Sequence, residues 1–390
     1  MKNIVIGQAG GPTSVMNATL AGLTEALMEE NSLTFLKQGY EGLSQNRFLN
    51  DDSYVLDWIL SHKNIPGACL GSGRYALDGV KLEACADNLK RLNADALVVI
   101  GGNGTMEALR KIEQKTMERN YQLQVIGLPK TVDNDLGCTD HAPGFASAAN
   151  YIARATLDMG RDLYAMKNFE QVRILETMGR NTGWLAAASG LFKAYEEDGP
   201  HFIAIPEQKL VKQDLLKSVE ASVNKYGCAL IVTSEGVQWD SGSQMNRKVI
   251  NGRPVLGGIS AGIEAEIQKE LGFTSRSELL GMNQRSASAL VTETDREEAY
   301  QAGAAGGKWV KAGLTDMMAA FQRSDDAHYH INIEPVSLKA VADYGERQMP
   351  EQFSSDLSAY YNWLKPLVDN KMVSYPSLAP RRENDGKREL

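Results

Sequence analysis

The sequence predicts an α/β fold in which two similar domains each contain a mostly parallel sheet. In the first half of the 390-residue chain, short apolar runs alternate with amphipathic helical stretches, which is typical of parallel strands joined by helices. A second series of this kind follows an Ala- and Ser-rich segment, residues 145–157, which we expect to be a helix. Turns marked by glycine or proline follow three of the apolar runs. Ligands bind at this edge of open α/β sheets, so these turns predict the site.

The first series begins near the N-terminus. Its expected strands are residues 4–6, 96–100 and 125–128. Apolar residues spaced three or four apart from Met16 to Leu27 lie on one face of a helix. The marked turns that follow the strands are residues 7–12, 101–105 and 129–135.

The second series has a similar order. Its expected strands are residues 172–175, 202–205 and 229–233. Segment 238–254, rich in Gly, Ser, Asn and charged residues, predicts a surface loop, and a helix is expected at residues 259–271. The last residues, 381–390, predict a polar tail.

Composition excludes several classes of partner. A formal net charge of −8 argues against nucleic acid and anionic membranes, because both need a basic surface. Small anions would need a local cluster of Arg and Lys. No apolar run approaches the roughly 18 residues of a membrane span, and the start of the chain enters a strand without a signal sequence, so we expect a soluble, cytoplasmic protein. The four cysteines are scattered, which predicts reduced, buried thiols.

Two of the turns predict phosphoryl transfer. Residues 101–105, Gly-Gly-Asn-Gly-Thr, offer backbone N–H groups with little side chain to obstruct a phosphate. The turn at 129–135 adds the cation of Lys130, the hydroxyl of Thr131 and two carboxylates, Asp133 and Asp135. One carboxylate can accept a proton from an attacking hydroxyl, and the other can hold Mg²⁺. A purely structural turn seldom needs so many opposite charges.

Other turns supply the cations that an anionic ligand requires. Arg74 lies in a glycine-flanked turn, Arg180 follows the strand at 172–175, and Arg276 and Arg285 lie further along the chain. The glycine turn after the first strand matches neither the dinucleotide-binding pattern nor the P-loop. A single arginine is more often part of a surface salt bridge, but together with Lys130 these residues meet the requirement.

With these motifs in order along the chain, the sequence resembles the phosphofructokinase family over nearly its whole length. The matching segments, in the family's order, are Gly-Gly-Pro-Thr at 10–13, Gly-Tyr-Glu-Gly-Leu at 39–43, Gly-Gly-Asn-Gly-Thr at 101–105, Pro-Lys-Thr-Val-Asp-Asn-Asp at 129–135, Met-Gly-Arg at 178–180, Ser-Glu-Gly at 234–236 and Gln-Arg at 284–285. The resemblance implies two Rossmann-like, three-layer domains with the active site in the cleft between them. It assigns residues 1–147 with about 286–340 to a donor-binding domain, and 148–285 with about 341–380 to a sugar-phosphate-binding domain.

The resemblance also implies roles for individual residues. Asp133 would be the general base on the sugar 1-hydroxyl, and Asp135, with Asn103, would lie on the magnesium side. The residues expected to stabilise the transferred group are Lys130, Thr131 and Arg180. Those expected to bind the phosphoryl donor are Gly11, Arg74, Tyr75, Gly102, Asn103, Gly104 and Thr105. Those expected to bind the sugar phosphate are Met178, Gly179, Glu235, Arg276 and Arg285, together with Thr131, Asp133, Asp135 and Arg180. Because Arg276 would reach in from a neighbouring subunit, a homodimer or homotetramer is expected.

Gly104 carries the prediction of the donor. Pyrophosphate-dependent members typically have Asp at this position, which fills and repels the space of a nucleotide α-phosphate, whereas Gly leaves that space open. Lys130 recurs in pyrophosphate enzymes and in some ATP-dependent relatives, so it does not discriminate between the donors. The sequence therefore predicts an ATP- and Mg²⁺-dependent 6-phosphofructokinase of glycolysis that converts fructose 6-phosphate to fructose 1,6-bisphosphate, with pyrophosphate as the alternative donor.

Three departures from the family pattern leave alternatives open. Asn103 stands where many relatives have Asp, Met282 where bacterial ATP enzymes commonly have a His on the sugar phosphate, and Gln171 where an inter-subunit Arg is expected. A related acceptor, such as sedoheptulose 7-phosphate, is one alternative. A sugar-phosphate sensor that has lost turnover is another, because fold alone does not establish function.

Overall fold

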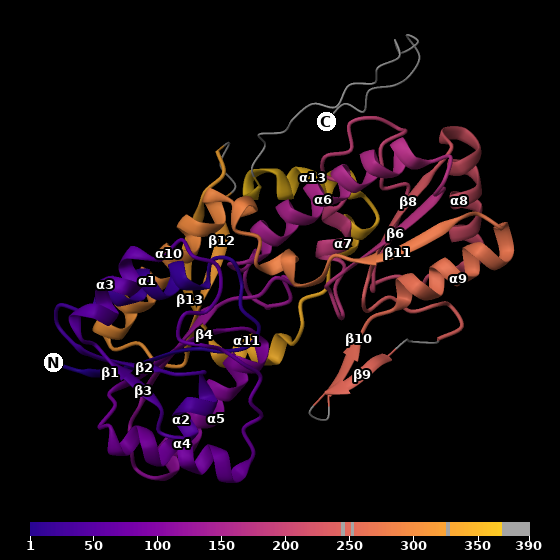
Figure 1. The fold of residues 1–390 in the computed structure, drawn as a ribbon. Helices are drawn as coiled ribbons and strands as arrows, with labels where there is room; N and C mark the ends of the chain where they lie inside the picture. Colours follow the sequence, from indigo (N-terminus) through magenta and orange to yellow (C-terminus); the bar gives the residue numbers. More distant parts are fainter. Residues whose placement is uncertain (243–245, 251–252, 325–327, 369–390) are drawn as a thin grey trace. The chain divides into compact units, whose positions relative to one another are not determined.

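The computed structural model describes residues 1–242, 246–250, 253–324 and 328–368 (Figure 1). The predicted tail at 381–390 lies outside the described residues. The chain divides into two compact units, which are residues 1–147 with 285–347, and residues 148–284 with the segment that begins at 348. Residues 341–347 therefore belong to the first unit. No helix among the described residues is long and apolar enough to cross a membrane.

The first unit contains a seven-stranded sheet that is parallel except at its two edges. Its strand order is β13–β12–β5–β4–β1–β2–β3, with β1 at Asn3–Gln8, β2 at Ser32–Leu36, β3 at Phe48–Asn50, β4 at Ala96–Gly101, β5 at Gln124–Pro129, β12 at Met317–Arg323 and β13 at Ile331–Ser337. The order places β5, β4 and β1 side by side, so the three marked turns leave the same edge of the sheet.

Helices cover both faces of this sheet (Figure 1). Along β1, Ile4 and Ile6 pack into one core and Val5 packs into the other, as expected for side chains that alternate across a strand. The first core also receives side chains from α1 (Met16–Leu27), α3 (Ser53–Ser61) and α10 (Glu293–Ala312), and the second from α2 (Tyr40–Ser44), α4 (Gly79–Arg91), α5 (Asn103–Glu118) and α11 (Leu338–Tyr344). A Cβ on Gly22 of α1 would lie 2.0 Å from the carbonyl oxygen of Tyr300 in α10, so these two helices need glycine to pack this closely.

The second unit contains a parallel four-stranded sheet, which is also covered on both faces. Its order is β11–β6–β8–β7, with β6 at Val172–Thr177, β7 at Phe202–Ala204, β8 at Ala229–Ser234 and β11 at Ser275–Leu279. Apolar residues of α8 (Lys212–Tyr226) and α9 (Ile259–Leu271) form one core with β6 and β8. The other helices described in this unit are α6 at Phe145–Met166, which begins just before the unit boundary, α7 at Trp184–Ala188, α12 at Glu351–Ser354 and α13 at Leu357–Leu364, followed by a short 3₁₀ turn at Lys365–Leu367 (η3). The 3₁₀ turn at Gly281–Arg285 (η1) spans a unit boundary, and the one at Ser288–Leu290 (η2) lies in the first unit.

The α/β class and the expected strands and helices are confirmed, with two corrections to their extents. The segment 238–254 is not a continuous loop, because it contains β9 at Asn246–Ile250 and enters β10 at Arg253–Leu256, an antiparallel pair. The helix expected at 145–157 continues to Met166, because Leu163 extends its buried stripe beyond the Ala- and Ser-rich part. The four cysteines are free thiols, but only Cys85 and Cys228 are buried.

Candidate functional site

The three turns of the first unit meet at the carboxyl edge of β1, β4 and β5. The loop at residues 71–75 joins them, since the N–H of Gly10 donates to the carbonyl oxygen of Gly73 at 2.9 Å. Gly10 has a φ of 81°, a backbone conformation that glycine adopts without strain. The structure thus gathers in one unit the predicted residues Gly11, Arg74, Tyr75, Gly102, Asn103, Gly104, Thr105, Lys130, Thr131, Asp133, Asp135 and Arg285.

The turn after β4 leads directly into α5. A Cβ on Gly101 would lie 2.1 Å from Oγ1 of Thr105, so only glycine allows the helix to start this close to the strand. The hydroxyl of Tyr40 supports the first turn by donating to the carbonyl oxygen of Thr105 at 2.9 Å. No side chain caps the N-terminus of α5, and a Cβ built on Gly104 would meet no described atom within 4 Å apart from its chain neighbours and the backbone of its own helix. An open helix N-terminus of this kind suits an anionic phosphate.

Three cations surround the glycine turn after β1. Lys130 is only 5% exposed, and its Nζ would lie 3.1 Å from a Cβ on Gly10. Nη1 of Arg285 would lie 2.5 Å from a Cβ on Gly11. Burial lowers the pKa of Lys130 to about 8. The carboxylates of Asp135 and Asp133 raise this pKa, and the positive charges of Arg285 and Arg74 lower it further. Burial, followed by the charge of Arg74, also lowers the pKa of Arg285.

Arg285 was expected as the last residue of the segment 148–285, and the structure places the boundary one residue earlier, at Gln284. Arg285 belongs to the first unit, because η1 ends at this residue and the chain returns there. The hydroxyl of Ser14 donates to its carbonyl oxygen at 3.3 Å, which attaches it to the glycine turn. The mutual electrostatic repulsion of Lys130, Arg285 and Arg74 would be relieved by a bound polyanion.

The carboxylate of Asp135 is held by two neutral donors. Oγ1 of Thr131 donates to its Oδ1 at 2.8 Å, and Nδ2 of Asn103 reaches its Oδ2 at 3.2 Å and its carbonyl oxygen at 2.9 Å. The N–H of Asp133 donates to Oγ1 of Thr131 at 3.1 Å. The hydroxyl hydrogen of Thr131 is therefore used to orient Asp135.

These oxygens fit a magnesium ion that arrives with a phosphoryl donor. Each oxygen of Asp135 retains acceptor capacity beyond its hydrogen bond, and Asn103 contributes an amide oxygen. The described residues contain no group of three or more His, Cys, Asp or Glu that could hold a metal by themselves. Mg²⁺ commonly binds through one or two protein carboxylates together with substrate phosphates and water, so a small donor set suffices.

In the second unit, the ends of β6 and β8 bring together four of the nine predicted sugar-phosphate residues, Met178, Gly179, Arg180 and Glu235. The N–H of Glu235 donates to the carbonyl oxygen of Thr177 at 3.0 Å. Gly179 has a φ of 121°, and the hydroxyl of Ser234 donates to its carbonyl oxygen. A Cβ on Gly236 would lie 1.6 Å from the carbonyl oxygen of Arg180, so glycine is required where the two turns touch.

Gln284 attaches η1 to the turn after β6 and was not among the predicted site residues. Its Oε1 accepts the N–H of Met178 at 2.9 Å, and its Nε2 donates to the carbonyl oxygen of Gly281 at 2.9 Å. This fixes the short turn that carries Met282, whose side chain is 59% exposed. The Gln-Arg pair at 284–285 was the sequence signal for this residue, but the pair alone does not distinguish a buried, hydrogen-bonded Gln from one on the surface.

Arg276 does not join this group. It pairs in register with Arg173 near the start of β6, whereas Met178 and Arg180 follow the end of that strand. Its side chain is 57% exposed and lies 3.3 Å from Oε2 of Glu170. Gln171 lies at the same end of the sheet, where its N–H donates to the carbonyl oxygen of Thr274 at 2.9 Å. A role for Arg276 in a neighbouring subunit stays a prediction.

The low pKa of Lys130 predicts a pH dependence of donor binding. The side chain of Lys130 is a charged ammonium below a pH of about 8 and a neutral amine above it. We therefore expect kcat/KM for the phosphoryl donor to fall as the pH rises through this value. This parameter is the informative one because it reports ionisations of the free enzyme. Steady-state kinetics across this range measure the effect. Lys130→Met is the control, with a low kcat/KM and no decline at this pKa. A wild-type profile that stays flat well above a pH of about 8 would contradict the assignment.

Comparisons with known proteins agree with this geometry. The family model described as Phosphofructokinase matches residues 3–310. The chain is 42% identical to a sulfofructose kinase of Alkalicoccus urumqiensis, over 95% of this chain and 97% of that protein. It is 33% identical to a pyrophosphate–fructose 6-phosphate 1-phosphotransferase of Xanthomonas campestris pv. campestris, over 90% of this chain and 86% of that protein.

A solved structure agrees as well. The pyrophosphate-dependent phosphofructokinase of Nitrosospira multiformis superposes with a TM-score of 0.84 at 29% identity, and the match covers 98% of this chain and 94% of that one. The family model and the relatives both extend over the turns that carry the candidate site. The chain therefore belongs to the phosphofructokinase family.

Proposed function

We propose that this protein transfers a phosphoryl group from ATP to the C1 hydroxyl of a ketohexose that carries an anionic group on C6, and that sulfofructose is its preferred acceptor. The observation that carries the proposal is the grouping of Lys130, Asp133 and Asp135 beside the open N-terminus of α5. Such a group supplies a base, a metal-side carboxylate and a cation, which phosphoryl transfer uses for positioning and charge neutralisation.

The open space at Gly104 supports ATP as the donor. A pyrophosphate ends where a nucleotide continues, so a donor with further phosphate and nucleoside needs room beyond the first turn of α5. A Cβ on Gly104 meets no described atom within 4 Å, and the residue is exposed. Arg74, Lys130 and Arg285 can balance the charges of a triphosphate chain.

The absence of a charged side chain at position 282 favours an acceptor that carries a sulfonate. A phosphate monoester carries about −1.5 to −2 charges near pH 7, whereas a sulfonate carries one. Met282 is neutral where the family pattern has a protonatable side chain, and Gln171, at the other end of the sheet, is neutral where the pattern has an Arg that would act in a neighbouring subunit. A pocket with fewer positive charges matches the singly charged group better, in agreement with the 42% identity to a protein named as a sulfofructose kinase.

The proposed chemistry follows from the positions of three side chains. Asp133 accepts the proton of the C1 hydroxyl while this oxygen attacks the terminal phosphorus, and the bond to the leaving ADP oxygen breaks on the opposite side. Lys130 neutralises charge on the transferred group. Thr131 and Asn103 keep the carboxylate of Asp135 oriented. When bound at Asn103 and Asp135, Mg²⁺ would neutralise and align the donor phosphates.

Pyrophosphate with fructose 6-phosphate is the second candidate. It is favoured by the 33% identity to a pyrophosphate–fructose 6-phosphate 1-phosphotransferase, and Lys130 is compatible with either donor. Pyrophosphate as the donor would leave the open space at Gly104 unfilled. It also leaves the neutral residues at 171 and 282 without an explanation.

A two-by-two assay separates the candidates. Purified protein with Mg²⁺ is offered ATP or pyrophosphate, each with sulfofructose or fructose 6-phosphate, and phosphorylated product is measured. We expect the highest kcat/KM for ATP with sulfofructose. A preference for pyrophosphate with fructose 6-phosphate would overturn the proposal, and ligand-induced thermal stabilisation without any product would favour a sensor.

Met282→His tests the reason for the acceptor preference. A charge-assisted hydrogen bond contributes about 1.5–3 kcal/mol, so His at this exposed position should raise kcat/KM for fructose 6-phosphate by about tenfold or more relative to that for sulfofructose. Met282→Gln is the matched control, because it adds polarity without a positive charge. Equal effects of both variants would show that charge at position 282 does not select the acceptor.

A further inference from the structure

A segment far along the chain holds the loop that contains Asp135. We refer to residues 344–347, which begin at the last residue of α11, as the clamp segment. The N–H of Arg347 donates to the carbonyl oxygen of Asp135 at 2.8 Å. Leu136 and Glu346, the neighbours of these two residues, form an isolated antiparallel bridge. The clamp segment therefore pairs with the main chain of the loop directly after the predicted catalytic residues.

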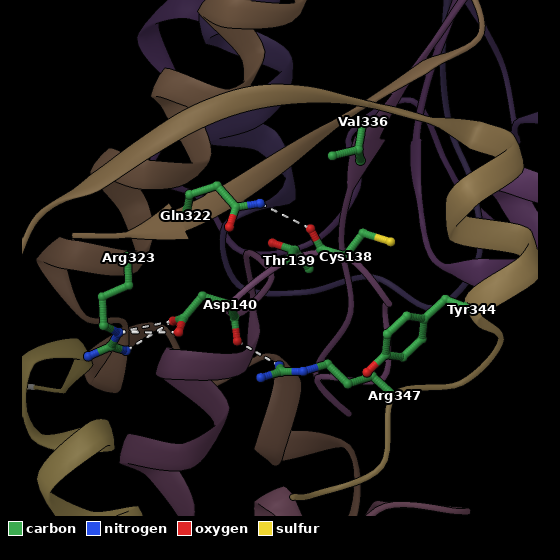
Figure 2. Close-up of a pocket in the computed structure, with 8 residues that line it drawn as sticks. All are labelled: Cys138, Thr139, Asp140, Gln322, Arg323, Val336, Tyr344 and Arg347. Carbon is green, nitrogen blue, oxygen red and sulfur yellow. Dashed lines mark hydrogen bonds and ion pairs between the residues drawn. The ribbon is translucent and has the colours of Figure 1, made fainter. Parts of the chain in front are cut away.

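The side chain of Arg347 reaches the other end of the same loop. Its Nη1 donates to the carbonyl oxygen of Asp140 at 2.6 Å (Figure 2). The carboxylate of Asp140 is in turn held by Arg323 of β12 at 3.0 Å and by Nδ1 of His141 at 2.8 Å. Arg347 thus connects the two ends of residues 135–140 through one main-chain and one side-chain hydrogen bond.

This loop has a backbone that needs external support. Within it, Cys138 has a φ of 63°, which residues other than glycine and asparagine rarely adopt. Such conformations persist when the surrounding structure over-determines them. A Cβ on Gly137 would lie 2.5 Å from Cδ1 of Tyr344, so the first residue of the clamp segment packs directly on the loop.

The main-chain carbonyl oxygen of Asp135 links the clamp segment to Asn103 and Asp135, the two residues predicted to hold Mg²⁺. The carbonyl oxygen of Asp135 accepts from the N–H of Arg347 at 2.8 Å and from Nδ2 of Asn103 at 2.9 Å. The same Nδ2 reaches the carboxylate of Asp135 at 3.2 Å. A shift of the loop would therefore move Asp135 and break its hydrogen bonds with Asn103, the two residues that the proposed function assigns to Mg²⁺.

We propose that Arg347 is a positioning residue for phosphoryl transfer. It touches neither donor nor acceptor in this proposal, and it acts by fixing the main chain of residues 135–140 so that Asp135 and Asn103 keep their relative geometry. The kinetic part of this inference rests on the proposed function. The structural part, that the guanidinium of Arg347 holds the loop, does not.

The surroundings of Arg347 make the inference testable by chemical rescue. Arg347 lines an open pocket of about 650 Å³, whose other walls include Cys138, Gln322, Val336 and Tyr344 (Figure 2). Removing the guanidinium leaves space that is continuous with this pocket. A guanidinium ion from solution can enter there and donate to the carbonyl oxygen of Asp140.

Arg347→Met retains an unbranched apolar side chain and removes the guanidinium. Loss of a residue that orients metal ligands typically costs 10- to 100-fold in metal affinity or activity. Because the main-chain hydrogen bond from residue 347 to Asp135 remains in the variant, we expect the Mg²⁺ concentration for half-maximal activity to rise by about tenfold, the lower end of this range. Added guanidinium chloride, kept far below denaturing concentrations, should reverse the rise at least in part, and Arg347→Lys should be less affected than Arg347→Met. Lys339→Met, which removes an exposed cation from α11, is the matched control with no expected change.

Amide hydrogen exchange gives a readout that needs no turnover. Exchange of the amides of residues 133–140 should be faster in Arg347→Met than in the wild type or Lys339→Met, and guanidinium should slow it again. Unchanged exchange, or an unchanged Mg²⁺ requirement in an active Arg347→Met enzyme, would overturn the inference. If the wild type used none of the offered donors and acceptors, the proposed function would fail, while exchange would still decide whether Arg347 holds the loop.

Discussion

Replacement of Asp133 by Asn is expected to lower kcat by roughly 10²–10⁴-fold, which is the usual range for removal of a general base. The amide of Asn cannot accept the proton of the C1 hydroxyl, while its size is almost that of the carboxylate. The fold should be unaffected, because the hydrogen bond from Asp133 to Thr131 uses the main-chain N–H and remains in the variant. Initial rates with ATP and each acceptor measure kcat, and thermal unfolding checks the fold.

The acceptor KM separates a chemical role of Asp133 from a binding role. If Asp133 acts as the base, kcat falls with little change in the KM of the acceptor, because the lost interaction belongs to the transition state. Asp343→Asn is the matched control, since it neutralises an exposed carboxylate on α11 and should leave kcat unchanged. A kcat of Asp133→Asn within about threefold of the wild type would remove Asp133 from the proposed mechanism, because base removal costs far more.

The central strands could be predicted from the sequence because they are buried on both faces. The run at β4 consists almost wholly of buried apolar residues, and β8 begins with four of them, so their hydrophobicity alone identifies these strands. β11 has the sequence Ser-Arg-Ser-Glu-Leu, and β13 alternates partly buried with exposed positions. Both are edge strands, and pairing with one neighbour defines them more than burial does. They therefore carry no comparable signal in the sequence.

The turn chemistry of the site could also be predicted, but the contacts between distant segments could not. The residue types at 129–135, together with the glycine turn at 101–105, indicate phosphoryl transfer. The contact of Arg285 with the turn at Gly11 depends on where η1 leads the chain. The hydrogen bonds of Arg347 likewise depend on the antiparallel return of β13 and on the end of α11. Long-range packing determines these contacts, and local residue patterns do not predict them.

Replacement of Gly104 by Asp is expected to reduce kcat/KM for ATP by about three orders of magnitude and to leave the use of pyrophosphate intact. Two like unit charges about 4 Å apart repel by about 4 kcal/mol at an effective dielectric constant of about 20, and each 1.36 kcal/mol corresponds to about a factor of ten. The new carboxylate would stand in the space that is open in this chain, in front of the first turn of α5.

The stability of this variant should not fall, which distinguishes a donor effect from misfolding. Gly104 has no positive φ and its Cβ position is open, and an acidic residue in the first turn of a helix is favourable for the helix dipole. Gly104→Ala is the matched control, because it adds a Cβ without charge and should keep most ATP-dependent activity. Similar losses in the two variants would mean that bulk, and not charge, limits the donor at this position. An undiminished kcat/KM for ATP in Gly104→Asp would instead place the nucleotide elsewhere, and the argument for ATP from Gly104 would then fail.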